Sequence, residues 1–343
     1  MNEVLNTLYV QTQGAALRLD HDTVQVRVEK QLRLRVPLLR LEGIVLFGRV
    51  AATGPLIQRC AAEGRSLVWM SRFGRFRARV VGPTDGNVLL RRAQHLALSD
   101  EGREAAIARQ IVAAKIQNSR NQLLRSARDA RRPDDAAALT QVAQRLADTL
   151  TRLRTMERVN DIRGAEGEAA RDYFGVFGRM IAEQRDAFGF DGRSRRPPRD
   201  RTNAVLSFFY SLLSNECSAA LEGVGLDPQV GYLHALRPGR PSLALDLVEE
   251  LRAPLADRLT LTLINRRQLQ AKHFEDVPGG GVYLNEDGRR AALNAYEERK
   301  KTEVAHRAMK MKIPFGLVAH VQARLLARHL RGDLTHYPPF VYR

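Results

Sequence analysis

One histidine and three acids lie close together in the stretch LHALRPGRPSLALDLVEELRAP, residues 233–254. His234 precedes a turn flanked by prolines, and Asp246, Glu249 and Glu250 follow in what the apolar spacing predicts to be a short helix. Carboxylate oxygens, with at most one imidazole, are the ligands that Mg²⁺ or Mn²⁺ prefers in proteins. The residue types therefore suit a divalent metal site, provided that the turn brings His234 back over the helix.

A purely structural interpretation of the same residues is also open. An acid in the first turn of a helix, such as Asp246, interacts favourably with the helix dipole. Glu249 can pair with Arg252 on the helix surface, and Glu250 is expected on the surface as well. A single histidine is more often a structural residue than a ligand. Spacing alone does not rank the two interpretations.

A further candidate ligand, Glu166, lies well upstream in the segment RGAEGEAARDYFG. It sits between Ala165 and Gly167, and these small neighbours would allow a second helix or a ligand to approach closely. Glu168, two residues on, points elsewhere on a helix and is expected on the surface. Sites for hard cations usually draw ligands from separate elements, so Glu166 is a reasonable partner for His234 and an acid of the later helix.

The elements that must position these residues change character near Leu98. Up to about Gly86 the apolar residues alternate with polar ones, as in TVQVRVE and QLRLRVP, which predicts half-buried strands. From Ser99 onward apolar residues recur at helical spacing in nearly every segment. We therefore expect an α+β protein with a small strand-rich N-terminal domain, residues 1–95, and a larger, mostly α-helical domain, residues 96–343. The sheet edges of the first domain are a possible surface for pairing with another chain.

The chain is strongly basic, with 55 Lys plus Arg against 38 Asp plus Glu and a formal net charge of +17. Such an excess attracts polyanions, and the charge is bunched. We expect DNA contacts from a charged loop and from a later basic run, namely Arg193, Arg195, Arg196, Arg199 and Arg201, and Lys300 and Lys301. No apolar run approaches the roughly 20 residues of a membrane span, and a cytoplasmic location is expected.

Several segments, in order and spacing, resemble the CRISPR-associated integrase family that forms the catalytic subunit of the spacer-acquisition complex. They are GAEGEAARDYF, then RRPPRDRTNAVLSFFYSLLSNECSAALEGVGLDPQVGYLH, then SLALDLVEELRAPLADR, together with KIQNSRNQLLR and the start LNTLYVQTQGAALRLDHDTVQVRVE. The resemblance covers essentially the whole chain, and the N-terminus is most similar to members found with type I-C systems.

The resemblance implies the same two-domain fold and a Mg²⁺ or Mn²⁺ ion held by Glu166, His234 and Glu249. Asp246, one helical turn before Glu249, is implied as a further catalytic acid, and the sequence does not decide which of the two is the third ligand. Arg252 stands where some relatives carry lysine, which makes a contact with a DNA phosphate plausible.

The activity implied by the resemblance is a transesterification that needs no ATP. Double-stranded DNA with 3′-hydroxyl ends is joined to the CRISPR repeat, and water in place of the hydroxyl would hydrolyse DNA. The implied partners are a second copy of the chain, giving a homodimer, and a small ferredoxin-like adaptation subunit. Two other functions stay open, a general metal-dependent DNA nuclease and a non-catalytic basic nucleic-acid-binding protein.

Overall fold

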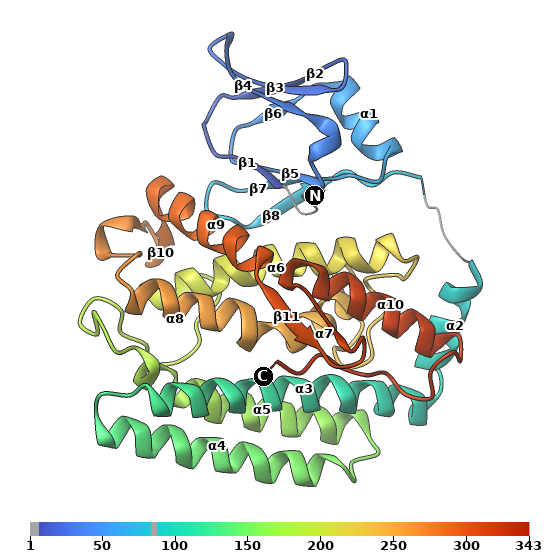
Figure 1. The fold of residues 1–343 in the computed structure, drawn as a ribbon, viewed down its shortest axis with the longest axis vertical. Helices are drawn as coiled ribbons and strands as arrows, with labels where there is room; N and C mark the ends of the chain where they lie inside the picture. Colours follow the sequence, from blue (N-terminus) through green and yellow to red (C-terminus); the bar gives the residue numbers. More distant parts are fainter. Residues whose placement is uncertain (1–6, 84–87, 343) are drawn as a thin grey trace. The chain divides into compact units, whose positions relative to one another are not determined.

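The computed structural model describes residues 7–83 and 88–342 and divides into two compact units, Met1–Gly86 and Asn87–Arg343. Strands dominate the first unit and helices the second, so the expected α+β class is confirmed (Figure 1). The division falls before helix α2 (Val88–Leu98), and this helix groups with the helical unit. Leu5 and Asn6, the first residues of the expected strand-rich start, lie outside the described residues.

The first unit contains two four-stranded sheets, in which the strand orders are β1-β5-β7-β8 and β4-β3-β2-β6. Alternation predicted these strands because Val24 and Val26 of β3 are buried together with Leu17 of β2. It did not predict that β1, β5 and β7 run parallel, since parallel pairing depends on crossovers between distant segments. The elements are β1 (Thr7–Val10), β2 (Ala16–Asp20), β3 (Thr23–Val28), β4 (Gln31–Pro37), η1 (Leu38–Arg40), β5 (Gly43–Phe47), β6 (Ala51–Ala52), α1 (Gly54–Ala62), β7 (Ser66–Met70) and β8 (Phe76–Arg79).

The second unit is built around α3, a long helix that packs against α4, α5 and α7 (Figure 1). Asp100 caps the start of α3, because its carboxylate accepts a hydrogen bond from the backbone N–H of Arg103 at 3.0 Å. The helices after α2 are α3 (Glu101–Arg128), α4 (Pro133–Leu153), α5 (Val159–Gly175), η2 (Phe177–Met180), α6 (Arg201–Gly223), α7 (Ser242–Leu251), η3 (Arg252–Asp257), α8 (Arg258–Asn265), η4 (Ala271–His273), α9 (Glu286–Lys301), η5 (Phe315–Leu317) and α10 (Val318–Leu330). No helix of the described chain is long and apolar enough to cross a membrane.

Two short hairpins interrupt the helices of this unit. The first pairs β9 (Phe274–Val277) with β10 (Gly281–Leu284). The second, β11 (Glu303–His306) with β12 (Met311–Pro314), was not predicted. Its cross-strand pair Val304 and Ile313 is buried, but charged neighbours mask the alternation.

A π-helix, η3, continues α7 and contains Pro254. A proline inside a helix cannot donate its backbone hydrogen bond and crowds the carbonyl four residues earlier, here that of Glu250. That carbonyl instead accepts a hydrogen bond from the Asn118 side-chain amide of α3 at 2.8 Å. The hydrogen bond from Asn118 therefore connects the end of α7 to the middle of α3, next to Glu249.

Candidate metal centre

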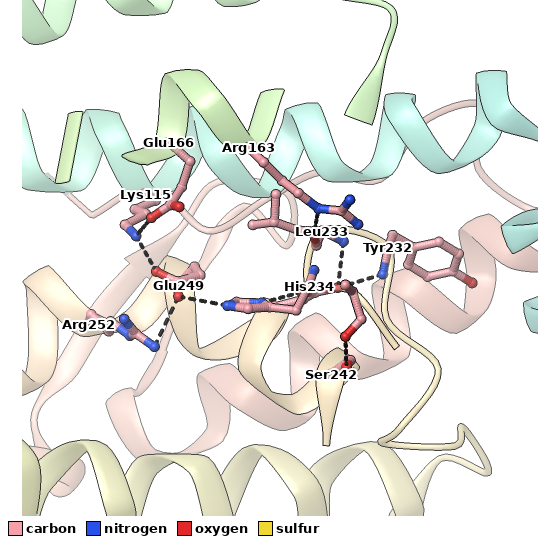
Figure 2. A network of polar contacts seen from close by, with 11 residues as sticks. Lys115, Arg163, Glu166, Tyr232, Leu233, His234, Ser242, Glu249 and Arg252 are labelled. Atoms are coloured by element: carbon pink, nitrogen blue, oxygen red, sulfur yellow. Dashed lines mark hydrogen bonds and ion pairs between the residues drawn. The ribbon is translucent and has the colours of Figure 1, made fainter. Parts of the chain in front are cut away.

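Four charged side chains from four segments of the helical unit meet at one point (Figure 2). The ammonium of Lys115, on α3, donates to Glu166 Oε1, on α5, and its Nζ lies 2.7 Å from Oε2 of Glu249, on α7. Nε2 of His234, in the loop after α6, lies 3.7 Å from Glu249 Oε1. The structure therefore brings together the three residues for which the resemblance implied metal binding, and adds a lysine between two of them.

His234 is held in place by Asp246. The Asp246 carboxylate lies 2.7 Å from His234 Nδ1 and accepts backbone N–H bonds from Tyr232, Leu233 and His234 at 2.7, 3.0 and 2.9 Å. Because an ionised carboxylate only accepts, Nδ1 carries a proton toward Asp246, and Nε2 is the ring nitrogen that faces Glu249. Both oxygens of this fully buried acid are thus already occupied by the loop.

The loop can approach Asp246 because position 231 is a glycine. A Cβ atom at Gly231 would lie 2.8 Å from Asp246 Oδ2 and 2.6 Å from the backbone carbon of Ser242. The other side of the loop is fixed from α5, where Arg163 Nε donates to the carbonyl oxygen of Leu233. Helices α5 and α7 therefore both set the position of His234, and Figure 2 shows this loop between them.

Glu249 carries the charge at the centre of the cluster. Burial opposes its ionisation, but the charges of Arg252, Lys115 and His234 outweigh this and lower its pKa from 4.5 to about 2. Arg252 Nη2 contacts Oε1 at 3.0 Å. Oε2 is buried and has no hydrogen-bond donor, since the 2.7 Å contact from Lys115 is an ion pair without hydrogen-bond geometry. Glu249 is thus an anion whose Oε2 is held only by the ion pair with Lys115.

The donor set fits a hard divalent cation. Two carboxylates and one imidazole are suitable ligands for such an ion. As they stand, no three His, Cys, Asp or Glu side chains within residues 7–83 and 88–342 are gathered closely enough to hold a metal ion. The Lys115 ammonium lies between the two acids that would have to converge.

Glu250 is not on the surface, and this expectation was wrong. Its side chain is fully buried and accepts bonds from Tyr337 Oη at 2.6 Å, Phe340 N at 2.7 Å and Gln322 Nε2 at 2.8 Å. Burial raises its pKa from 4.5 to about 7. Glu250 therefore anchors the C-terminal segment and takes no part in the cluster.

Glu250 makes the stability of the protein dependent on pH. The unfolded chain loses the Glu250 proton near pH 4.5, whereas the folded protein keeps it to about pH 7, so the free energy of unfolding falls as pH rises through this window. The loss amounts to roughly 2–4 kcal/mol. Glu250→Gln is expected to remove most of this dependence, as measured by urea unfolding of both proteins at about pH 5 and about pH 8. Equal pH profiles for the two proteins would contradict the assignment.

The arginines of the charged loop divide into two groups. Arg195, Arg196 and Arg199 are exposed. Arg193 is directed inward, where it donates to Asn203 Oδ1 at 2.6 Å and packs over the Tyr210 ring, and Arg201 donates to the Ala187 carbonyl at 2.8 Å. The two inward arginines hold the loop.

Three further cations expected to contact DNA have protein partners. Lys300 is only 4% exposed, and its ammonium contacts Glu216 and Glu297 at 2.8 and 3.2 Å. Lys301 is exposed and pairs with Glu298. The Arg252 guanidinium lies 4.8 Å from the centre of the Tyr210 ring and contacts Glu249, so it belongs to the cluster.

Sequence reasoning did not assign a role to Lys115. It lies in the segment KIQNSRNQLLR, which supported the resemblance, but 51 residues separate it from Glu166 and no spacing rule connects them. A second feature was missed for the same reason. Asp257 is buried and accepts hydrogen bonds from Tyr173 at 3.0 Å and Tyr210 at 2.5 Å beside the cluster.

The fold is shared with solved structures. A casposase bound to integration product aligns with 99% of this chain and 95% of its own, with a TM-score of 0.84 and 22% identity. A chain of a Cas6-RT-Cas1–Cas2 complex aligns with 98% of this chain over 36% of its own, with a TM-score of 0.82 and 22% identity. The architecture is therefore that of the Cas1 fold class.

The sequence comparisons agree with the fold. The family model described as CRISPR associated protein Cas1 matches residues 8–298. The CRISPR-associated endonuclease Cas1 1 of Moorella thermoacetica is 54% identical over 343 residues, which is the full length of both chains. The chain belongs to the Cas1 family, so the resemblance noted from the sequence is confirmed. The assignment to subtype I-C stays a prediction.

Proposed function

We propose that this protein is a metal-dependent DNA endonuclease and integrase that inserts new spacers into a CRISPR array. The observation that carries the proposal is that Glu166, His234 and Glu249, from three separate segments, lie together around the Lys115 ammonium. The chain is strongly basic and belongs to the Cas1 family. The close relatives are named as endonucleases, and a casposase of the same fold is bound to integration product. Both support a reaction on DNA phosphodiesters.

The proposed ligands of a Mg²⁺ or Mn²⁺ ion are Glu166, His234 and Glu249. Bound there, the ion would stabilise the charge that develops on the phosphate oxygens during strand transfer. His234 offers Nε2 because Asp246 holds its other nitrogen, and Glu249 offers Oε2, which has no hydrogen-bond donor and only the ion pair with Lys115. The geometry favours Glu249 over Asp246 as the third ligand, since the Asp246 oxygens are already filled.

Phosphate binding is proposed for the exposed cations and for Arg252. Arg195, Arg196 and Arg199 are exposed on the loop before α6 and suit the DNA backbone of any sequence. Arg252 forms an ion pair with Glu249 and lies at the edge of the cluster, where it is placed to neutralise a phosphate.

The proposed assembly is a homodimer that acts with a small companion subunit in the cytoplasm on DNA with 3′-hydroxyl ends. A Cas1-fold chain occurs together with Cas2 in one of the solved complexes, which supports a companion of this kind.

A strand-joining assay tests the proposed function. Purified protein, the companion subunit, an oligonucleotide duplex with free 3′-hydroxyls and a plasmid carrying a CRISPR repeat should give joined product only with Mg²⁺ or Mn²⁺. Glu166→Gln and His234→Ala are expected to abolish joining while retaining DNA binding. Metal-dependent cleavage without joining would indicate a general nuclease, and unchanged joining in both variants would refute the site.

A further inference from the structure

We infer that Lys115 is a resident cation of the metal centre, and that it competes with the divalent ion for Glu166 and Glu249. The inference rests on the metal centre proposed above. It gives Lys115 a defined role, which is to set the metal concentration at which the centre is loaded.

The position of the ammonium carries the inference. Nζ contacts Glu166 Oε1 and lies 2.7 Å from Glu249 Oε2, which is the oxygen without a hydrogen-bond donor (Figure 2). A divalent ion held by both carboxylates would need the same place. An ammonium and a divalent cation cannot occupy the same place together, because like charges at such short separations repel each other strongly.

Lys115 also explains how the two acids lie together in the free protein. Glu249 is only 2% exposed, and a carboxylate buried so deeply needs a positive charge close by. Lys115 supplies part of this charge from the middle of α3, whose packing fixes its backbone. Lysine suits an exchangeable role, since its ammonium is a point charge on a flexible stem and Glu166, 26% exposed, leaves a way out to solvent.

A second lysine in the same unit shows what a purely structural bridge looks like. Lys300 also contacts two carboxylates, those of Glu216 and Glu297, but Glu216 Oε2 accepts a further bond from Tyr296 Oη at 3.0 Å. The oxygen without a hydrogen-bond donor and the adjacent imidazole are features of the Lys115 bridge.

Binding of Mn²⁺ to the full-length protein, without DNA, tests the inference by titration calorimetry. Lys115→Met and Lys115→Gln each remove the competing charge and are expected to lower the Kd for Mn²⁺ about tenfold or more. The metal-free variants should melt at lower temperature than the wild type and recover when Mn²⁺ is added. Lys115→Arg keeps the charge and should keep the wild-type Kd, as should the matched control Lys300→Met.

The opposite result is equally clear. An unchanged or raised Kd in both neutral variants would overturn the inference and make Lys115 an organiser of the acids. If Lys115→Met does not fold, Lys115→Gln decides, because it retains a polar group at the same position. A different result would refute the proposed metal centre itself: the wild type binds no Mn²⁺, or it binds Mn²⁺ equally well after Glu249→Gln. The role of Lys115 would then fail as well.

Discussion

Replacing Glu249 by glutamine is expected to slow metal-dependent strand joining and cleavage about a hundred- to a thousandfold, while DNA binding persists. The side chain keeps its size but loses the charge that Arg252, Lys115 and His234 surround. A ligand that stabilises the reacting phosphate through a metal ion contributes several kcal/mol, and each ~1.4 kcal/mol is a factor of ten in rate. Joining rates at saturating Mn²⁺, with binding of the same DNA measured by fluorescence anisotropy, check this expectation.

Glu168→Gln is the matched control for this change. Glu168 lies on α5 near Glu166, but it is half exposed and pairs with Arg152 at 2.9 Å on the surface. Its replacement should leave the joining rate within about twofold, since an exposed ion pair contributes at most ~1 kcal/mol. Wild-type activity in Glu249→Gln, or an equal loss in both variants, would remove Glu249 from the reaction.

The fold was predictable wherever apolar periodicity is strong. Alternation in TVQVRVE and helical spacing after Ser99 led to the correct class because each pattern must bury one face. The β11–β12 hairpin was not predictable, since its strands have four residues each and carry charges beside the buried pair. Parallel pairing in the first unit likewise depends on contacts between distant segments, which local patterns do not contain.

The site was predictable in its residues but not in their roles. The resemblance supplied Glu166, His234 and Glu249, whereas only the geometry separates a carboxylate that has an oxygen without a hydrogen-bond donor from one with both oxygens filled. Glu250 was misplaced because α7 is buried almost all round rather than on one stripe. In such a helix every acid needs partners of its own, and Glu250 finds them in a C-terminal segment that lies far away in sequence.

Replacing Asp246 by asparagine is expected to impair both stability and activity, in contrast to Glu249→Gln. The carboxylate accepts three backbone N–H bonds and holds His234 Nδ1, so an amide in its place sets an N–H group against one of these donors. Loss of buried bonds to a charged acceptor is expected to lower the free energy of unfolding by about 2–4 kcal/mol. Urea unfolding measures this term, with Asp172→Asn, a partly exposed acid of α5, as the control.

The effect of Asp246→Asn on joining should act through His234. If the new amide faces Nδ1, the imidazole must accept there and carry its proton on Nε2, which leaves no lone pair on Nε2 toward Glu249. A supporting acid of this kind is worth about 10–100-fold in metal affinity or rate, less than the loss expected for Glu249→Gln. A different pair of results would make Asp246 itself the ligand: joining falls as much as in Glu249→Gln, and the free energy of unfolding stays unchanged. If Asp246 only held the loop of His234, its replacement would also lower the free energy of unfolding.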